Sequence, residues 1–288
     1  MADGERPRAS LFVVATPIGN LEDVTLRALR VLRECDEVLA EDTRHTLSLL
    51  RAHHIEKPLS RLDDHVVRDR IDALIAAMRE GRRFALVSDA GTPLVSDPGA
   101  LLVRAAADAG LVVEALPGPS AVLVALVLSG LGGGGFRFVG FVPRDGHARR
   151  ATLSAMARDP LPTVFFESPE RTADTLAELA PLCAPTRRAA ITRELTKFHE
   201  ECIRGDLPAL VARANEGLRG EVTVVLEGAP EELPASDAEA RDEVERALDS
   251  ALAAGMKPSD AAREVARALG LKRADVYARC LARSAKAP

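Results

Sequence analysis

Short apolar runs alternate with amphipathic stretches along this chain, and the alternation predicts an α/β protein. Runs such as residues 11–15 and 83–87 are typical of buried strands. Between them, leucines recur at helical spacing over residues 25–34, and a second helical stretch over 67–80 ends at a glycine. Strands that alternate with crossover helices form a largely parallel sheet. We therefore expect a parallel α/β domain over residues 10–117.

The pattern changes in the second half of the chain. Strand-like runs at residues 136–142 and 163–167 are still separated by a helical stretch near 148–158. From residue 188 onward, strand-like runs follow one another through short turns. This change predicts a mixed sheet, and we expect a second α/β domain over residues 118–228.

The last part of the chain reads as a separate helical domain over residues 240–288. The segment 229–240, with two prolines and four acidic residues, is typical of a linker. Beyond it the sequence predicts three short helices, about 239–254, 258–269 and 272–281. A glycine-containing turn between the last two resembles that of a helix-turn-helix.

The charge of the chain is unevenly distributed. The formal net charge is −5, which argues against a general nucleic-acid binder. Residues 241–288 nevertheless carry 10 Lys and Arg against 7 Asp and Glu. An enzyme that visits one site on a large RNA can rely on local basic patches. Four arginines bracket a candidate patch: Arg137, Arg144, Arg149 and Arg150.

Several classes of protein are disfavoured by what the sequence contains. The four cysteines lie far apart and the histidines lack ligand spacing, so we expect no disulfide framework and no metal site. The most apolar run, residues 121–128, is much shorter than the roughly 20 residues of a membrane-spanning helix. The N-terminal apolar run is also too short for a signal peptide. We therefore expect a cytoplasmic protein without membrane contact.

The most informative segment is the loop VSDAGTPLVSDPG over residues 87–99, which follows strand residues 84–87. Gly91 permits close backbone approach and Pro93 fixes a turn, while small side chains leave room for a ligand. Loops at the carboxyl ends of parallel strands are where α/β sheets bind ligands. Five other motifs accompany the loop along the chain: TPIGNLEDVTLRAL, AEDTR, PGPSA, FESPERTADTL and ITRELTKFHEE.

Together these motifs resemble the tetrapyrrole-methylase superfamily of S-adenosylmethionine (SAM) enzymes over about residues 10–228. The chain is similar to the branch that methylates a cytidine 2′-hydroxyl of 16S rRNA, and residues 16–20 lack the GxGPG turn of the porphyrin-methylating members. The resemblance implies two α/β domains with SAM in the cleft between them, plus a small C-terminal helical domain. It also implies 16S rRNA of the 30S subunit as the partner and a homodimeric assembly.

The resemblance also implies that SAM is held largely by backbone groups. The matching cofactor positions are Pro17, Ile18, Asp89, Ala90, Gly91, Thr92, Pro93, Val95, Ser120, Ala121 and Phe166.

Methyl transfer to a ribose hydroxyl also needs a nearby group that takes the proton. Asp42, which follows a strand, and Lys197, in a polar cluster, are the two candidates, and the sequence does not choose between them. The proposed substrate-binding residues are Arg44, Arg144, Arg171, Arg193 and Glu194. Guanidinium groups match phosphate oxygens. Structural salt bridges and solvated surface arginines are the alternatives for these positions.

Other functions stay open at this point. A SAM-dependent methylase of a small molecule such as a tetrapyrrole is one alternative, which the basic C-terminal helices oppose. A non-catalytic RNA- or DNA-binding module is another, which the large enzyme-like body opposes.

Two further motifs are excluded as sites. The glycine run at residues 132–135 is no phosphate-binding loop, because it lacks the Lys-Ser/Thr of a P-loop. Ser120 is no hydrolase nucleophile, because Val122 stands where the elbow needs glycine.

Overall fold

The structure is a computed structural model that describes residues 9–62, 64–95, 99–230, 237–253 and 256–269, together with 271, 276, 277 and 280. The chain divides into two compact units, Met1–Ala229 and Pro230–Pro288. The boundary lies at the start of the segment that the sequence predicts to be a linker. Among the described residues, no helix is both long and apolar enough to span a membrane.

The first sheet of the large unit is entirely parallel. Its five strands are β1 (Leu11–Val14), β2 (Glu37–Ala40), β3 (Leu59–Arg61), β4 (Phe84–Val87) and β5 (Val113–Leu116). They are ordered β3-β2-β4-β1-β5. The two inner strands β1 and β4 are apolar throughout their length because helices cover both faces of the sheet.

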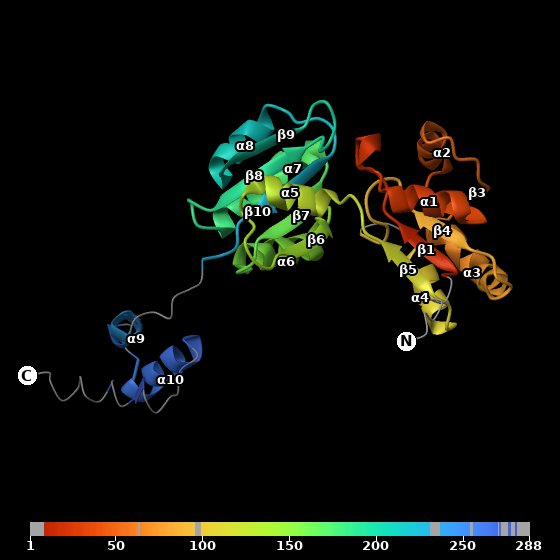
Figure 1. Cartoon of the computed structure of the whole chain (residues 1–288). Coiled ribbons are helices and arrows are strands. Elements are labelled where there is room, and N and C mark those ends of the chain that lie inside the picture. Colours follow the sequence, from red (N-terminus) through yellow and green to blue (C-terminus); the bar gives the residue numbers. More distant parts are fainter. Residues whose placement is uncertain are drawn as a thin grey trace, which may run out of the picture. The chain divides into compact units, whose positions relative to one another are not determined.

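Two pairs of helices cover this first sheet (Figure 1). After the short 3₁₀ turn η1 (Leu21–Asp23), α1 (Leu26–Glu34) and α2 (Thr43–Ala52) pack on one face. On the other face lie α3 (Asp64–Arg79) and α4 (Ala100–Asp108). Helix α1 begins where the Thr25 hydroxyl accepts a hydrogen bond from the backbone N–H of Ala28, which makes Thr25 its N-cap.

The second sheet is mixed, as the sequence pattern predicts. Its strands are β6 (Arg137–Phe141), β7 (Thr163–Glu167), β8 (Arg188–Arg193), β9 (Glu201–Asp206) and β10 (Val222–Leu226). They are ordered β6-β7-β10-β8-β9. Strands β6 and β7 are parallel, and the other neighbours are antiparallel.

The helices on the second sheet are unequally divided between its faces. Helices α6 (Gly146–Arg158), α7 (Pro169–Leu179) and α8 (Leu207–Asn215) contribute to the core on one face, and the 3₁₀ turn η2 (Ala180–Leu182) follows α7. Only α5 (Ala121–Ser129) packs on the other face among the described helices. The two sheets support a domain division near residue 117, which stays a proposal.

Two helices were absent from the sequence prediction. Helix α2 begins directly after Asp42, whose carboxylate caps it, so the AEDTR motif combines a strand end with a helix start. Helix α8 interrupts a region that the sequence reading assigned to strands and short turns, and that reading was wrong there. Asp206 ends β9 and accepts a hydrogen bond from the backbone N–H of Ala209, which starts α8.

The C-terminal unit contains α9 (Asp237–Ala253) and α10 (Pro258–Ala268). Their packing buries an apolar cluster that includes Val244, Leu248 and Val265. Helix α9 begins within the segment 229–240, so the predicted linker is too long at its C-terminal end. Most of the predicted third helix, 272–281, lies outside the described residues.

Candidate functional site

A pocket of about 440 Å³ lies where loops from both halves of the large unit meet. Its volume is within the range of about 300–1,000 Å³ that small-molecule sites occupy. One wall consists of segments that follow β1, β2 and β4. The other consists of residues at the end of β7, the start of β10 and the segment after β8. The pocket therefore lies at the carboxyl ends of the parallel strands, as expected for this fold class.

Backbone hydrogen bonds hold the first wall together. Thr16 and Gly91 form a two-way bridge, with N···O distances of 2.9 Å and 3.0 Å, that joins the segment after β1 to the loop after β4. Gly91 has a φ of +76°, and a Cβ added there would lie 3.2 Å from Cγ2 of Ile18. The Thr92 hydroxyl donates to the Pro119 carbonyl at 3.1 Å. These contacts bring three motifs that are distant in sequence to one wall.

The register of the second sheet builds the opposite wall. Strand pairing places Phe166 beside Thr223 and Glu167 beside Val222. All four of these residues line the pocket, together with Phe141. The rings of Phe141 and Phe166 lie 5.4 Å apart, so one side of the pocket is aromatic.

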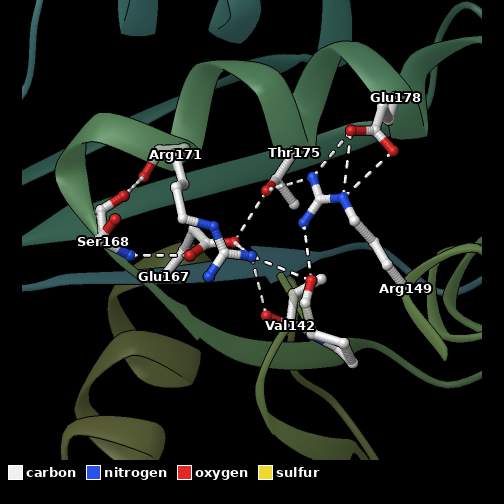
Figure 2. A network of polar contacts seen from close by, with 9 residues as sticks. Val142, Arg149, Glu167, Ser168, Arg171, Thr175 and Glu178 are labelled. Atoms are coloured by element: carbon white, nitrogen blue, oxygen red, sulfur yellow. Dashed lines mark hydrogen bonds and ion pairs between the residues drawn. The ribbon is translucent and has the colours of Figure 1, made fainter. Parts of the chain in front are cut away.

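A buried polar network stands behind this wall (Figure 2). The Glu167 side chain is fully buried. It accepts hydrogen bonds from the backbone N–H of Ser168 at 2.9 Å and from the Thr175 hydroxyl at 2.8 Å. The Arg171 guanidinium lies 3.3 Å from the same carboxylate. The network fixes the corner between β7 and α7, where Ser168 and Pro169 line the pocket.

Two arginines that the sequence analysis considered for RNA binding, Arg171 and Arg149, belong to this network. Arg171 donates through Nη2 to the carbonyls of Val142 and Pro143, at 2.9 Å and 3.0 Å, besides its ion pair. This placement favours a structural role for Arg171 over the phosphate contact expected from the sequence. Arg149 is buried and bonded to Glu178, so including it in an exposed basic patch was wrong.

The other arginines of the predicted patch and substrate set lie apart from the pocket lining. Arg137 forms an ion pair with Asp159. Arg193 donates from Nε to Glu201 at 2.6 Å. Arg144 is exposed in the connection between β6 and α6.

Lys197 is the centre of a polar cluster beside the second wall. Its Nζ donates to Glu194 at 2.9 Å and to Glu221 at 2.8 Å. Partial burial alone would lower the pKa of Lys197, but the hydrogen bonds and charges of the two glutamates outweigh it and raise that pKa. The hydrogen bond from Lys197 in turn lowers the pKa of Glu194. Leu195 and Glu221 line the pocket, whereas Lys197 is outside the lining set.

Asp42 lies beside the first wall. Its carboxylate caps α2 by accepting from the backbone N–H of Arg44 at 2.8 Å, and it is paired with the Arg44 guanidinium. These hydrogen bonds hold the pKa of Asp42 far below its usual range. The backbone N–H of Asp42 donates to the Asp89 carboxylate at 2.9 Å, which ties this turn to the pocket loop. The neighbouring Glu41 lines the pocket.

Most of the predicted cofactor positions line one pocket. These are Ile18, Asp89, Ala90, Gly91, Thr92, Val95, Ser120, Ala121 and Phe166. Pro17 instead lines a smaller pocket of about 120 Å³, which shares Asp89 with the large one. Pro93 is absent from both sets of lining residues, as are Asp42, Arg44, Lys197 and Glu194.

The sequence analysis missed several lining residues. They are Glu41, Val122, Phe141, Glu167, Ser168, Pro169, Leu195 and 220–223. Glu167 to Pro169 belong to a motif that was already noted, so their position directly after a strand was a usable signal. Residues 220–223 gave no such signal, because only strand pairing brings them beside β7. Among the described residues, no group of three His, Cys, Asp or Glu is placed to hold a metal ion.

Comparison with known proteins gives consistent matches for both units. The family "Tetrapyrrole (Corrin/Porphyrin) Methylases" matches residues 10–211, and the "RsmI C-terminal HTH domain" matches residues 237–284. Among solved structures, the methyltransferase CobJ aligns with a TM-score of 0.60 at 21% identity, over 77% of this chain and 95% of that one. This likeness shows the shared fold.

Curated relatives are closer in sequence. "Ribosomal RNA small subunit methyltransferase I" of Xylella fastidiosa is 41% identical, over 93% of this chain and 97% of that protein. The protein of the same name from Halalkalibacterium halodurans is 40% identical, over 94% of each chain. The chain therefore belongs to the tetrapyrrole methylase family and, within it, to the ribosomal RNA small subunit methyltransferase I family.

Proposed function

We propose that this protein is a SAM-dependent methyltransferase that modifies the 2′-hydroxyl of a cytidine in 16S rRNA of the small ribosomal subunit. The observation that carries the proposal is the match at 40–41% identity over at least 93% of the chain to rRNA small subunit methyltransferases I. The C-terminal unit also matches the helix-turn-helix domain of that family. We also propose that the enzyme acts in the cytoplasm, because its proposed substrate is ribosomal RNA.

The pocket suits SAM in size and in chemistry. Its first wall presents backbone and small side chains around Gly91, and its second wall presents the aromatic rings of Phe141 and Phe166. Asp89, Ser120 and Thr92 add polar groups at the lining. A few polar groups within an otherwise apolar pocket are typical of cofactor sites. We assign the nine lining positions predicted from the sequence to SAM binding.

When bound, SAM supplies a sulfonium methyl group, and the 2′-hydroxyl that receives it must lose a proton. Of the two candidate acceptors, Asp42 is held ionised by Arg44, because its pKa is lowered. Lys197 is held protonated, because its pKa is raised by Glu194 and Glu221. Only an unprotonated group can accept a proton, so Asp42 is the candidate in the required state at neutral pH, and its lowered pKa makes it a weak base in that role. Protonated Lys197 then pairs with Glu194 and Glu221 and holds these two carboxylates in place beside the pocket.

Contacts with RNA are assigned to groups that are exposed. Arg144 is exposed, and the Arg44 side chain is 86% exposed although it pairs with Asp42. Either guanidinium is accessible to a phosphate. The helix-turn-helix unit provides a further RNA-docking element, since the sequence from residue 241 onward carries an excess of basic residues.

We also propose a homodimer, and α5 supports this assembly. The first eight of its nine residues are apolar, yet Leu123 and Val127 are 51% and 79% exposed. A helix that is apolar on every side is normally buried. A second copy of the chain packing on α5 would cover this face. Light scattering should give a dimer, and Val127→Lys should shift it towards monomer.

The alternative substrate is a tetrapyrrole. Solved uroporphyrin-III and cobalt precorrin-4 methyltransferases share the fold at 19–24% identity, but that likeness carries no substrate assignment. The much higher identity to rRNA methyltransferases supports RNA instead.

Methyl-labelled SAM and purified 30S subunits provide the test. The protein should transfer label to 16S rRNA, and the modified linkage should resist alkaline cleavage because its 2′-hydroxyl is blocked. Uroporphyrinogen serves as the competing substrate. Label on a nucleobase alone, or on the tetrapyrrole alone, would overturn the proposal.

A further inference from the structure

Phe198 is 96% exposed, more than any other large apolar side chain that the structure describes. It lies in residues 194–200, the connection between β8 and β9. Its one recorded ring contact is with the adjacent His199, edge-on at 5.0 Å between ring centroids. The side chain therefore contributes little to the core of the fold, and its ring faces are accessible to a partner.

The connection that carries Phe198 has a defined backbone. Glu194 and Thr196 adopt positive φ values of +51° and +64°, which non-glycine residues keep only when their surroundings hold them. The backbone N–H of Lys197 donates to the Glu194 carbonyl at 3.0 Å, and that of Glu200 donates to the Lys197 carbonyl at 3.1 Å. The Glu200 carboxylate accepts from the backbone N–H of Thr196 at 2.6 Å. The ring is thus carried on a preorganised turn.

This turn is anchored to the pocket. Leu195 is buried in the cluster that includes Ile18, and both residues line the pocket. A Cβ added to Gly19 would lie 2.5 Å from Cγ of Lys197, so the turn also packs tightly against the segment after β1. Phe198 therefore follows Leu195, a pocket-lining residue, by three positions along the chain.

The charges around Phe198 restrict what its ring can meet. Lys197 is already bonded to Glu194 and Glu221, and the turn carries a third carboxylate, Glu200, which is bonded to the backbone of Thr196. An ammonium group already paired with two carboxylates, on a turn that carries a third, makes a poor site for a phosphate. An exposed aromatic ring in such surroundings suits an uncharged flat surface, and a nucleobase provides one.

We propose that Phe198 is a stacking platform for an unpaired base of the RNA substrate, adjacent to the nucleotide that enters the pocket. The inference rests on the proposed rRNA methylation. Sequence-specific RNA recognition targets unpaired bases, which stack on aromatic side chains. Phe198 thereby becomes a positioning residue, which holds the RNA strand beside the pocket without touching the reacting atoms.

The test compares Phe198→Ala, Phe198→Leu and Phe198→Trp in the full-length protein. The control is Leu182→Ala, which removes a half-exposed apolar side chain in η2, beyond the end of α7 that is remote from the pocket. Binding of 30S subunits is measured over a range of salt concentrations, along with kcat and KM for methyl transfer. SAM affinity and sedimentation are measured for every variant.

Because base stacking contributes to the free energy of RNA binding, Phe198→Ala should weaken RNA binding about tenfold and raise KM. SAM affinity should stay unchanged within about twofold. The slope of log K against log salt should not change, because stacking releases no counterions. Phe198→Trp should retain affinity and Phe198→Leu should lose most of it, since leucine is apolar but has no aromatic face.

Three outcomes would overturn the inference. They are unchanged RNA binding in Phe198→Ala, full retention in Phe198→Leu, and a change in sedimentation that identifies Phe198 as a contact between copies of the chain. If the wild-type protein does not methylate 16S rRNA at all, the proposed function fails first. The two failures are therefore distinguishable.

Discussion

Replacing Gly91 by valine tests the pocket at the position where the backbone leaves least freedom. Gly91 has a φ of +76°, and its N–H and C=O are both bonded to Thr16, so the chain cannot relax by rotating at this residue. A β-branched residue in that region costs about 1–2 kcal/mol of strain. The new Cβ would also lie 3.2 Å from Cγ2 of Ile18, a pocket-lining residue, and its methyl groups would extend further.

Gly110→Val is the matched control. Gly110 has nearly the same φ, +72°, but no atom lies within 4 Å of a Cβ built there, and it is outside the pocket lining. Both variants should lose roughly 1–2 kcal/mol of stability, or about 2–8 °C in Tm for a unit of this size. Only Gly91→Val should weaken SAM binding, by about tenfold or more, because only there does the new side chain displace the lining.

Calorimetric titration with SAM and thermal unfolding provide the two measurements. If both variants bind SAM with the affinity of the wild-type protein, the reasoning is refuted, since the pocket loop would then not form the cofactor site. Equal loss of affinity in both would assign the effect to general destabilisation.

Three further predictions concern other parts of the chain. Arg149→Ala should lower the free energy of unfolding by about 2–3 kcal/mol in urea, since it leaves the Thr175 hydroxyl and Pro143 carbonyl without this donor, whereas exposed Arg150→Ala should change it by under about 0.5 kcal/mol. If Asp42 accepts the proton, kcat should be flat from about pH 5 to 8, because its lowered pKa keeps it ionised; a tenfold rise per pH unit would assign the role to neutral Lys197, whose pKa is raised. Deleting Pro230–Pro288 should leave SAM affinity within about twofold, while RNA affinity falls and the salt slope drops by roughly 0.7–0.9 per lost phosphate contact; an unchanged slope would contradict RNA docking by this unit.

The sequence predicts the strands of this fold well because buried strands carry continuous apolar runs. Residues 163–167 were predicted with the bounds that the structure shows. Helix α8 was missed because its nine residues follow a strand directly, with Asp206 serving both the strand end and the helix cap. A short helix of this kind gives too few turns for a clear helical period.

The site was predictable where it depends on local backbone chemistry. The loop after β4 is recognisable in the sequence by Gly91 and its small neighbours. Nine positions assigned from this and other motifs line the pocket. Glu221 and Val222 could not be found in that way, because their place in the wall depends on the antiparallel register with β7. The buried state of Arg149 depends equally on tertiary packing, since the same residue on a bare helix would be solvated.

The two walls of the pocket are held in shape by different forces, and this difference sets how each responds to substitution. The first wall depends mainly on main-chain hydrogen bonds between Thr16 and Gly91, to which Thr92 and Asp89 each add one side-chain bond, so changes that move the backbone should disturb it most. The second depends on the buried carboxylate of Glu167, whose partners include the Thr175 hydroxyl and Arg171. A buried charge that loses its partners is strongly destabilising. Side-chain changes behind the second wall should therefore alter the pocket from a distance, whereas comparable changes around the first wall should act mainly where they touch the ligand.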